Sequence, residues 1–271
     1  MGIKNIESRA RLIFNKYRDN KLKKDSINLA SDIKNALENC ADEIPVFIVS
    51  YNNGIYVENT INQLQSFGIT PIIIDNNSTD LTSLKILKKI KNNHTAQVVF
   101  SDKNFGFMVG FLNHIYPLLP EVFAYSDPDL QFNKNLPDDF LSKLASLTKK
   151  YSVYKAGFAL ELLEEETIID QVINKMRGVP MIYNQEFSVR EWESQYWRIP
   201  ISHDNLILYS APIDTTFAVY KKSNYNGFFD AIRVAGDYSA IHLPWFPRLD
   251  LMAESNKREY LKGNNSSTWI K

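Results

Sequence analysis

Short, largely apolar runs alternate with helical patterns between residues 45 and 130, and this alternation limits the possible folds most strongly. The apolar runs occupy residues 46–49, 71–74, 97–100 and 122–125. Runs this short and this apolar are typical of parallel strands that are buried on both faces. The segments between them carry apolar side chains at three- and four-residue spacing, which is the period of a helix. The pattern therefore predicts βαβ units, a mostly parallel sheet flanked by helices and an α/β fold.

The same spacing rules predict the remaining elements. In the repeating part we expect helices at 56–67, 81–90 and 106–118. Beyond residue 137 the pattern is less regular, and it predicts a helix at 137–149 and strands at 152–160, 206–209 and 216–220. No low-complexity linker separates these parts, which favours one compact domain.

Residues 1–41 are predicted to form a helical extension ahead of this domain. A basic stretch runs from Lys16 to Lys24, between the two helices that we expect there. Two interpretations stay open. The helices pack on the domain or on a second copy of the chain, or the basic amphipathic segment contacts the anionic inner face of a membrane.

The composition excludes several classes of protein. The 271 residues carry 31 Lys and Arg against 31 Asp and Glu, and this neutral balance argues against a nucleic-acid partner. No apolar run is long enough to span a membrane, and residues 1–9 lack the apolar core of a signal peptide. The single cysteine, Cys40, excludes an internal disulfide. We therefore expect a cytoplasmic protein.

Polar side chains gather where the four predicted strands end. They occupy residues 50–52, 75–78, 102–104 and 127–129. Because ligands of open α/β sheets bind beyond the carboxyl ends of the strands, these segments predict the binding site.

Asp127 and Asp129 are the strongest candidates for a metal site. Two carboxylates at positions i and i+2 of a turn can converge on one cation, and oxygen ligands suit Mg²⁺ or Mn²⁺. The alternative is a turn or helix cap built from Asp and Pro128.

Asp75 ends the second predicted strand, where its carboxylate could accept hydrogen bonds from a base or a ribose. Ser78 or Asp80 could instead cap the helix that follows. The chain has neither a Gly-x-Gly-x-x-Gly motif nor a Walker motif, which disfavours dinucleotide oxidoreductases and P-loop NTPases.

Four segments, in order, resemble the GT-A glycosyltransferases, particularly those of family 2. They are residues 45–52, 74–80, 104–113 and 126–129, the last of which resembles the Asp-x-Asp metal motif of that family. The resemblance implies the GT-A fold (Rossmann-like, of the nucleotide-diphospho-sugar transferases) and a nucleotide-sugar donor, most often a UDP-sugar, held with Mn²⁺ or Mg²⁺. The residues that it places around the donor are Ser50, Tyr51, Asn52, Asp75, Asn77, Asn104, Gly106 and Asp127, with Asp127 and Asp129 on the metal.

The resemblance also implies a general base from a later loop, and two residues are candidates. Asp237, within residues 234–238, is the first, since it could take the proton from an acceptor hydroxyl. Asp214 is the alternative, and it could equally bind acceptor hydroxyls or cap a turn.

His242, close to Pro244 and Trp245, resembles the late histidine with which some GT-A transferases complete the metal site. A hydrogen-bonded structural role is the alternative. A metal-binding histidine would favour a retaining reaction without a base, so the choice between inversion and retention stays open.

Trp192 and Trp197 lie in a polar segment and could stack on the apolar faces of an acceptor sugar. Plain core packing is the alternative. Residues 264–269 are expected to be either a lid over the donor or a disordered tail.

Together these features predict a metal-dependent glycosyltransferase that acts on a glycan or glycolipid acceptor in surface polysaccharide or lipooligosaccharide synthesis. Its expected parts are a helical extension at 1–43 and a GT-A domain at 44–271, with a donor half at 44–136 and an acceptor half and tail at 137–271. Two rival interpretations are a sugar-1-phosphate nucleotidyltransferase, which would need a better glycine-rich segment than 52–54, and a non-catalytic glycan-binding scaffold.

Overall fold

The computed structural model describes residues 21–169, 172–173, 187–203 and 205–263. Its α-helices are α2 (Ile27–Glu38), α3 (Gly54–Gln65), α4 (Leu81–Asn92), α5 (Phe140–Tyr151), α6 (Val189–Ser194) and α7 (Glu254–Gly263). Its strands are β1 (Val46–Ser50), β2 (Ile72–Asp75), β3 (Gln97–Phe100), β4 (Val122–Ser126), β5 (Leu130–Phe132), β6 (Lys155–Leu160), β7 (Val172–Ile173), β8 (Phe187–Ser188), β9 (Pro200–His203), β10 (Leu206–Ser210), β11 (Ala218–Lys221) and β12 (Ala231–His242).

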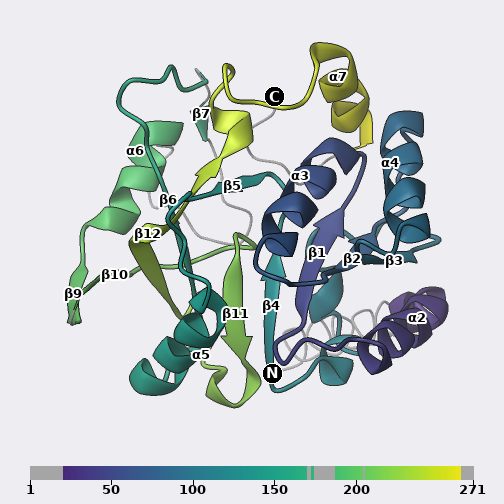
Figure 1. Cartoon of the computed structure of the whole chain (residues 1–271), viewed down its shortest axis with the longest axis horizontal. Coiled ribbons are helices and arrows are strands. Elements are labelled where there is room, and N and C mark those ends of the chain that lie inside the picture. The colour runs from purple at the N-terminus through teal and green to yellow at the C-terminus, as the bar shows by residue number, and fades with distance from the viewer. Residues whose placement is uncertain (1–20, 170–171, 174–186, 204, 264–271) are drawn as a thin grey trace, which may run out of the picture.

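The first half of the sheet is parallel, as predicted. Its strands lie in the order β3-β2-β1-β4 and are joined through α3 and α4 (Figure 1). The register pairs Ser50 with Asp75 and Asp75 with Phe100, so the carboxyl ends of β1, β2 and β3 lie at one edge. The α/β prediction for this part of the chain is confirmed.

The second half makes the sheet mixed rather than mostly parallel. β11 lies between β4 and β6 and is antiparallel to both, and β12 is parallel to β6. β5 and β10 pair antiparallel with β12, and β9 pairs antiparallel with β10. β11 and β6 approach so closely that a Cβ at Gly157 would collide with the backbone oxygen of Phe217.

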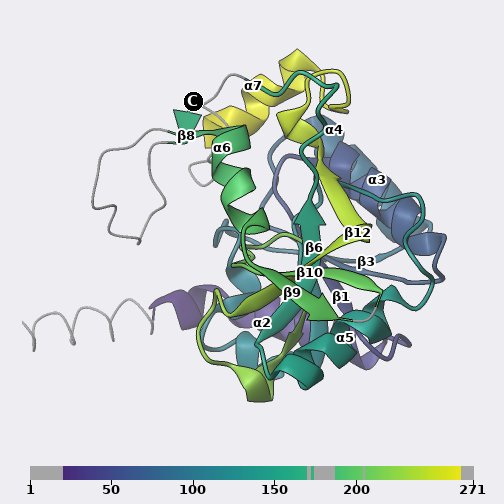
Figure 2. The ribbon, with the colours of Figure 1, turned by 90° about the vertical axis from the view of Figure 1, so that its left-hand side faces the viewer.

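Helices cover both faces of the sheet (Figures 1 and 2). On one face α3, α4 and α5 bury Val57, Ile61, Leu87, Phe140 and Leu144 against the strands. On the other face α2 and the segment between β3 and β4 bury a second cluster. The two clusters fit strands whose side chains are apolar on both sides.

The predicted helix at 106–118 is wrong. Only two 3₁₀ turns form there, at Val109–Phe111 and Tyr116–Leu118. The hydroxyl of Tyr125 donates to Phe107 O at 2.7 Å and accepts from Gly110 N at 3.2 Å, so it captures backbone groups that a helix would need. Pro117 also lacks the N–H that a helix interior requires.

The expected loop at 234–238 is also wrong, because these residues lie inside strand β12. The pairing with β6 shifts between Val234 and Ser239, so the intervening residues form a bulge, and Gly236 there has φ +68°. No alternating pattern runs through this bulged strand, because the extra residues break the period of two.

The part of the extension that the structure describes packs on the domain. Leu29, Ile33 and Ala36 of α2 are buried in the second cluster. The Asp25 carboxylate pairs with Lys103 at 2.9 Å. These contacts agree with the first interpretation of residues 21–41, while residues 1–20 lie outside the described part of the chain.

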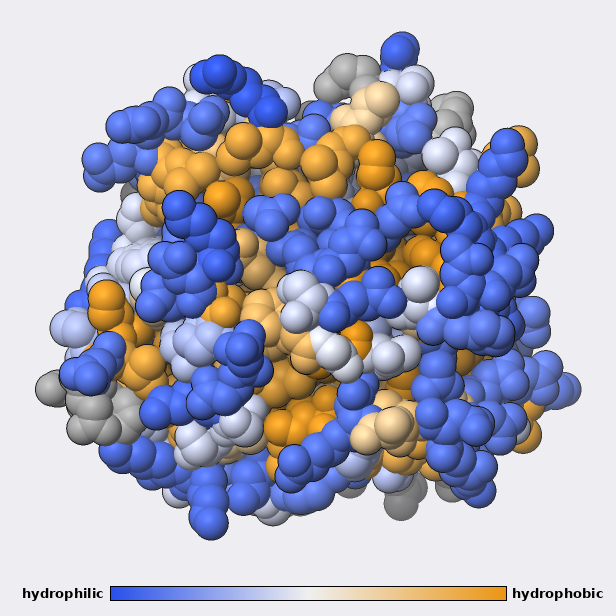
Figure 3. All heavy atoms as spheres, in the orientation of Figure 1, coloured by the Kyte–Doolittle hydropathy of each residue, from blue (hydrophilic) through white to orange (hydrophobic). Residues whose placement is uncertain are grey.

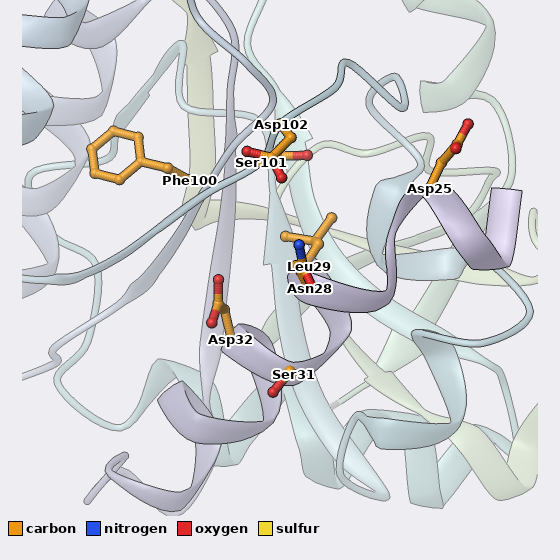
Figure 4. Close-up of a pocket in the computed structure, with 8 residues that line it drawn as sticks. All are labelled: Asp25, Asn28, Leu29, Ser31, Asp32, Phe100, Ser101 and Asp102. Carbon is orange, nitrogen blue, oxygen red and sulfur yellow. The ribbon is translucent and has the colours of Figure 1, made fainter.

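A cavity of about 330 Å³ lies between the start of α2 and the end of β3 (Figure 4). It is lined by Asp25, Asn28, Leu29, Ser31, Asp32, Phe100, Ser101 and Asp102. Within the described helices, none combines the length and apolar character that crossing a membrane requires.

Replacing Ile33 tests whether α2 belongs to the folded core. Ile33 has no exposed surface, whereas Ile27 on the same helix is 63 % exposed. We expect Ile33→Ala to lower the free energy of unfolding in urea by about 2–4 kcal/mol, because it removes buried methyl groups and leaves a cavity. Ile27→Ala is the matched control and should change it by no more than about 0.5 kcal/mol. Equal, small effects of both changes would show that α2 is a detachable appendage.

Candidate active site

Asp127 and Asp129 lie just beyond the carboxyl end of β4, at the edge where β1 and β2 also end. Asp127 is half-buried, and Asp129 is only 5 % exposed. The backbone N–H of Asp127 donates to Thr215 O at 3.0 Å, and the Thr215 hydroxyl donates to Asp127 Oδ2 at 2.5 Å. Thr215 therefore fixes the orientation of the Asp127 carboxylate.

Helix α3 holds the other side of this turn. The Thr60 hydroxyl donates to Pro128 O at 2.5 Å, and Gln63 Nε2 donates to Leu130 O at 3.0 Å. Gln63 Oε1 also accepts from Phe132 N at 2.6 Å. Sequence reasoning missed Thr60 and Gln63, although two polar side chains on the inner face of a predicted buried helix were a usable signal.

His242 lies beside Asp129, with its Nε2 3.4 Å from Asp129 Oδ2. The pairing of β12 with β5 sets this contact, because it aligns His242 with Leu130. The N–H of Leu243 donates to Asp129 O at 3.0 Å. The ring of His242 also packs on Trp245, with 4.6 Å between ring centroids. The structure thus places two of the three predicted metal ligands, Asp129 and His242, side by side.

The two carboxylates repel each other in this position. Burial and the charge of Asp129 raise the pKa of Asp127 to about 7, although the Thr215 hydroxyl opposes the shift. Asp129 Oδ1 is buried and accepts no hydrogen bond. A buried oxygen without a donor next to a second carboxylate is a fit for a divalent cation.

No three His, Cys, Asp or Glu side chains form a complete metal cage among the described residues. This is compatible with Mg²⁺ or Mn²⁺ bound by one or two carboxylates, since such ions take their other ligands from water and substrate phosphates.

Asp75 is the last residue of β2 and is nearly fully buried. Its carboxylate accepts from the N–H of Ser78 at 3.1 Å and from the Ser78 hydroxyl at 2.5 Å. Burial raises its pKa, and the bonds from Ser78 and Ser50 oppose that shift. Asp80 is the residue that caps α4, since its Oδ2 accepts from Ser83 N at 2.7 Å.

Two buried asparagines connect the loops at this edge. Asn52, with φ +52°, accepts on Oδ1 from Thr79 N at 2.7 Å and from Asp80 N at 2.9 Å. Asn76 donates to Gly106 O at 2.7 Å and accepts from Phe105 N at 3.0 Å. The loops after β1, β2 and β3 are therefore one hydrogen-bonded unit.

The other residues that were predicted to surround the donor lie on the same loops. Tyr51 is half-buried, and Ser50 is buried with its hydroxyl bonded to Asn53 Oδ1 at 3.0 Å. Asn77, with φ +65°, and Asn104 are both exposed. The Asn104 carboxamide accepts from Gly106 N at 2.8 Å.

The C-terminal part of the described chain also reaches this edge. The hydroxyl of Tyr56 donates to Asp250, and Lys257 forms an ion pair with Asp250 at 2.6 Å. The charge of Asp129 contributes to the raised pKa of Tyr56, behind the larger effects of burial and Asp250. Residues 264–269, the predicted lid, lie outside the described residues.

Asp214 lies next to the acidic pair, and Asp237 does not. Asp214 is exposed at its side chain, and its charge contributes to the raised pKa of Asp127. Asp237 is exposed on the bulge of β12. Burial raises the pKa of the neighbouring Tyr238, and the charges of Asp139 and Asp237 add to that shift. Although Asp214 keeps exposed surface, desolvation by the surrounding protein atoms raises its pKa, and Lys155 and Arg233 oppose that shift.

The aromatic segment docks beside Asp214 through a buried ion pair. Glu193 of α6 pairs with Arg233 of β12, and the Arg233 guanidinium lies over the ring of Tyr196, 4.2 Å from its centroid. Burial raises the pKa of Glu193 to about 7, although the positive charge of the nearby Arg233 opposes this shift. This ion pair, which sequence reasoning missed, fixes α6 to the sheet.

Trp197 and Trp192 have different surroundings. Trp197, with Leu162 and Ser194, lines a cavity of about 230 Å³. Trp192 packs its ring against Phe187 and Tyr196 and contacts the main core. On the face seen in Figure 3, hydrophobic surface gathers in the upper part between α6 and α7, and hydrophilic side chains cover much of the rest.

Repulsion at the acidic pair predicts a pH dependence of the metal-free protein. Because the pKa of Asp127 rises from 3.8 to about 7 on folding, the folded state binds more protons between these values, and stability falls as the pH rises through this window. We expect Asp127→Asn in EDTA to be increasingly more stable than wild type from pH 4 to 7, by about 2 kcal/mol at pH 7 after solvent screening. Urea unfolding at a series of pH values measures this difference, and a constant difference would contradict the repulsion.

Comparison with known proteins shows a match between part of this chain and one protein family. Residues 46–159 match the family model described as "Glycosyl transferase family 2". A search of the curated proteins found no match.

Three solved structures show remote similarity. A mannosyltransferase, PcManGT from Pyrobaculum calidifontis in complex with GDP-Man and Mn²⁺, is 11 % identical over 83 % of this chain and 66 % of its own, with a TM-score of 0.42. TarS from S. aureus is 18 % identical over 49 % of this chain and 24 % of its own, with a TM-score of 0.34. TarS 1–349 is 16 % identical over 50 % of this chain and 42 % of its own, with a TM-score of 0.31.

The chain thus spans less than two thirds of the length of each of these proteins. The family match covers β1 to β6 almost completely and includes Asp75, Asp127 and Asp129. Residues 46–159 of this chain, less than half of its length, therefore resemble a glycosyl transferase family 2 domain.

Proposed function

We propose that the chain is a metal-dependent glycosyltransferase that moves a sugar from a nucleotide-sugar to a glycan or glycolipid acceptor. The observation that carries the proposal is the acidic pair, Asp127 and Asp129, in the stretch that matches the family 2 model, with a buried Asp129 oxygen that no protein donor meets. We infer a UDP-sugar donor, and an acceptor from surface polysaccharide or lipooligosaccharide synthesis, from the resemblance of the four motifs.

Asp127 and Asp129 would hold Mn²⁺ or Mg²⁺, with His242 beside them. A bound cation neutralises charge that develops on the leaving diphosphate. Thr215 and α3 keep the two carboxylates in place without a cation, so the cost of assembling the site is met during folding.

The donor nucleoside would lie against the linked loops after β1, β2 and β3. Tyr51, Asn77 and Asn104 offer accessible polar or aromatic side chains there. Asp75 already accepts a hydrogen bond from Ser78 and so orients the loop after β2. In addition, it would accept a hydrogen bond from the base or the ribose of the donor. The hydrogen bonds of Asn52 and Asn76 make the pocket wall rigid.

Asp214 is the better candidate for the general base. It is exposed beside Asp127, whereas Asp237 lies on the β12 bulge. In the proposed step the acceptor oxygen bonds to the anomeric carbon, the bond from that carbon to the diphosphate oxygen breaks, and the hydroxyl proton passes to the Asp214 carboxylate. This displacement inverts the configuration of the transferred sugar.

The acceptor would lie on the side of the crevice that α6 forms. The cavity at Trp197 is next to the Arg233–Glu193 pair, which borders Asp214. An aromatic ring at a cavity wall suits the apolar face of a sugar. Trp192, which packs into the core, has a structural role in this proposal.

Loss of the Asp129 carboxylate tests the function. We expect wild type to release nucleotide from a nucleotide-sugar only with Mn²⁺ or Mg²⁺, and Mn²⁺ with the nucleotide-sugar to raise the melting temperature. Asp129→Asn should lower turnover by at least about a hundredfold, because it removes a charged metal ligand. Asp138→Asn, an exposed carboxylate on the β5–α5 connection, is the control and should keep wild-type turnover. If a panel of nucleotide-sugars gives no release with wild type, the scaffold interpretation holds instead.

Replacing each of the two candidate bases by asparagine, one at a time, tests which of them acts as the base. We expect Asp214→Asn to lower kcat by about 10²–10⁴-fold while the enzyme still binds Mn²⁺, because general-base catalysis contributes that much. Asp237→Asn should retain kcat within about threefold, since exposed substitutions away from the site have small effects. Steady-state turnover of both variants at saturating donor decides the assignment, and the reverse pattern would return the role to Asp237.

A further inference from the structure

Lys155 at the start of β6 is a lysine with no exposed surface. Its Nζ donates to Asp214 O at 2.9 Å and to the Tyr220 hydroxyl at 3.4 Å. It also lies over the ring of Phe228, 3.7 Å from the centroid. Neither the sequence motifs nor the proposed chemistry uses this lysine.

Burying a lysine side chain at this position is unfavourable in free energy. Isolated charges lose their hydration in the protein interior, and an apolar side chain of similar volume is often at least as stable. The residues on either side, Tyr154 and Ala156, are buried as well, so Lys155 lies in the interior of the protein. The hydrogen bond to Asp214 O is what an apolar residue would lose.

The carbonyl that Lys155 holds belongs to the turn that orients the acidic pair. Thr215, the next residue, donates its hydroxyl to Asp127 Oδ2 and accepts from Asp127 N. Arg233 holds the same turn two residues before Asp214, because its Nε donates to Pro212 O at 2.9 Å. Two buried basic side chains thus hold the backbone on both sides of residue 213.

We propose that Lys155 is a positioning residue, which acts through the 212–215 turn to set the Asp127 carboxylate for the cation and the Asp214 carboxylate for the acceptor. This inference rests on the proposed function. Lys155 touches neither substrate nor cation in this scheme. It supplies a fixed donor beneath the turn, so that Thr215 keeps one position relative to Asp127.

A double-mutant cycle tests the route through the turn. Lys155→Met and Thr215→Val are made singly and together, and Mn²⁺ binding is measured from the EPR signal of free Mn²⁺. Each single change should weaken Mn²⁺ binding by about tenfold, as is usual for residues that orient metal ligands. The double variant should be little weaker than either single one, because both changes release the same carboxylate.

Lys222 provides the matched control. Its Nζ also donates to a backbone carbonyl, Leu119 O at 2.8 Å, and also lies over an aromatic ring, that of Tyr116. Leu119 precedes β4, whereas Asp127 follows that strand. Lys222→Met should leave Mn²⁺ affinity and turnover unchanged. Lys155→Gln, which keeps a hydrogen-bond donor, should recover part of the loss and serves in the same cycle if Lys155→Met does not fold.

Three outcomes overturn the proposal. In the first, Lys155→Met binds Mn²⁺ and turns over donor like wild type. In the second, its effect adds fully to that of Thr215→Val, so that the two residues act independently. In the third, wild type itself neither binds Mn²⁺ nor releases nucleotide, and then the proposed function fails together with the role of Lys155. The first two outcomes leave the proposed function intact.

Discussion

The insertion of β11 between β4 and β6 is the constraint on which the site depends. This single antiparallel strand joins the parallel first half of the sheet to the mixed second half. Because β11 pairs with β4, the turn before β11 lies directly beside Asp127. β11 also pairs with β6, which sets Lys155 opposite Tyr220, and from there the Lys155 side chain reaches Asp214 O in that turn. Gly157 allows the close approach, since any side chain there would collide with Phe217 O. Residues far apart in the chain meet through this one strand.

The fold holds two carboxylates of like charge, Asp127 and Asp129, close to each other. Asp127 and Asp129 are held by Thr215, Thr60 and backbone contacts, none of which supplies a positive charge. Burial, together with the resulting repulsion, raises the pKa of Asp127. A site that is assembled in advance of its cation has less to reorganise when charge develops on a leaving group. The neutral composition of the chain hides this local imbalance, because the balancing lysines are spread elsewhere on the surface.

Sequence patterns predicted the first half well and the second half poorly, for physical reasons. β1 to β4 are short, apolar on both faces and separated by helices, so their period is easy to recognise. The segment at 106–118 has helical spacing, but Tyr125 captures its backbone from a neighbouring strand, which no local pattern reveals. β12 was missed because its bulge disrupts the alternation. Asp127 and Asp129 follow a strand directly, whereas Thr215, Lys155 and Arg233 reach the site only through long-range pairing.

The position of β11 has a consequence for how the stretch that matches the family 2 model can be handled in the laboratory. The stretch that matches the family model ends at residue 159, inside β6, yet β4 and β6 are not neighbours in the sheet. The strand between them, residues 218–221, lies well outside that stretch, and α2 before it covers the other face of the sheet. A chain cut to residues 46–159 would therefore expose the pairing edges of two central strands and part of both cores. The recognisable unit of sequence and the cooperative unit of folding have different boundaries in this protein.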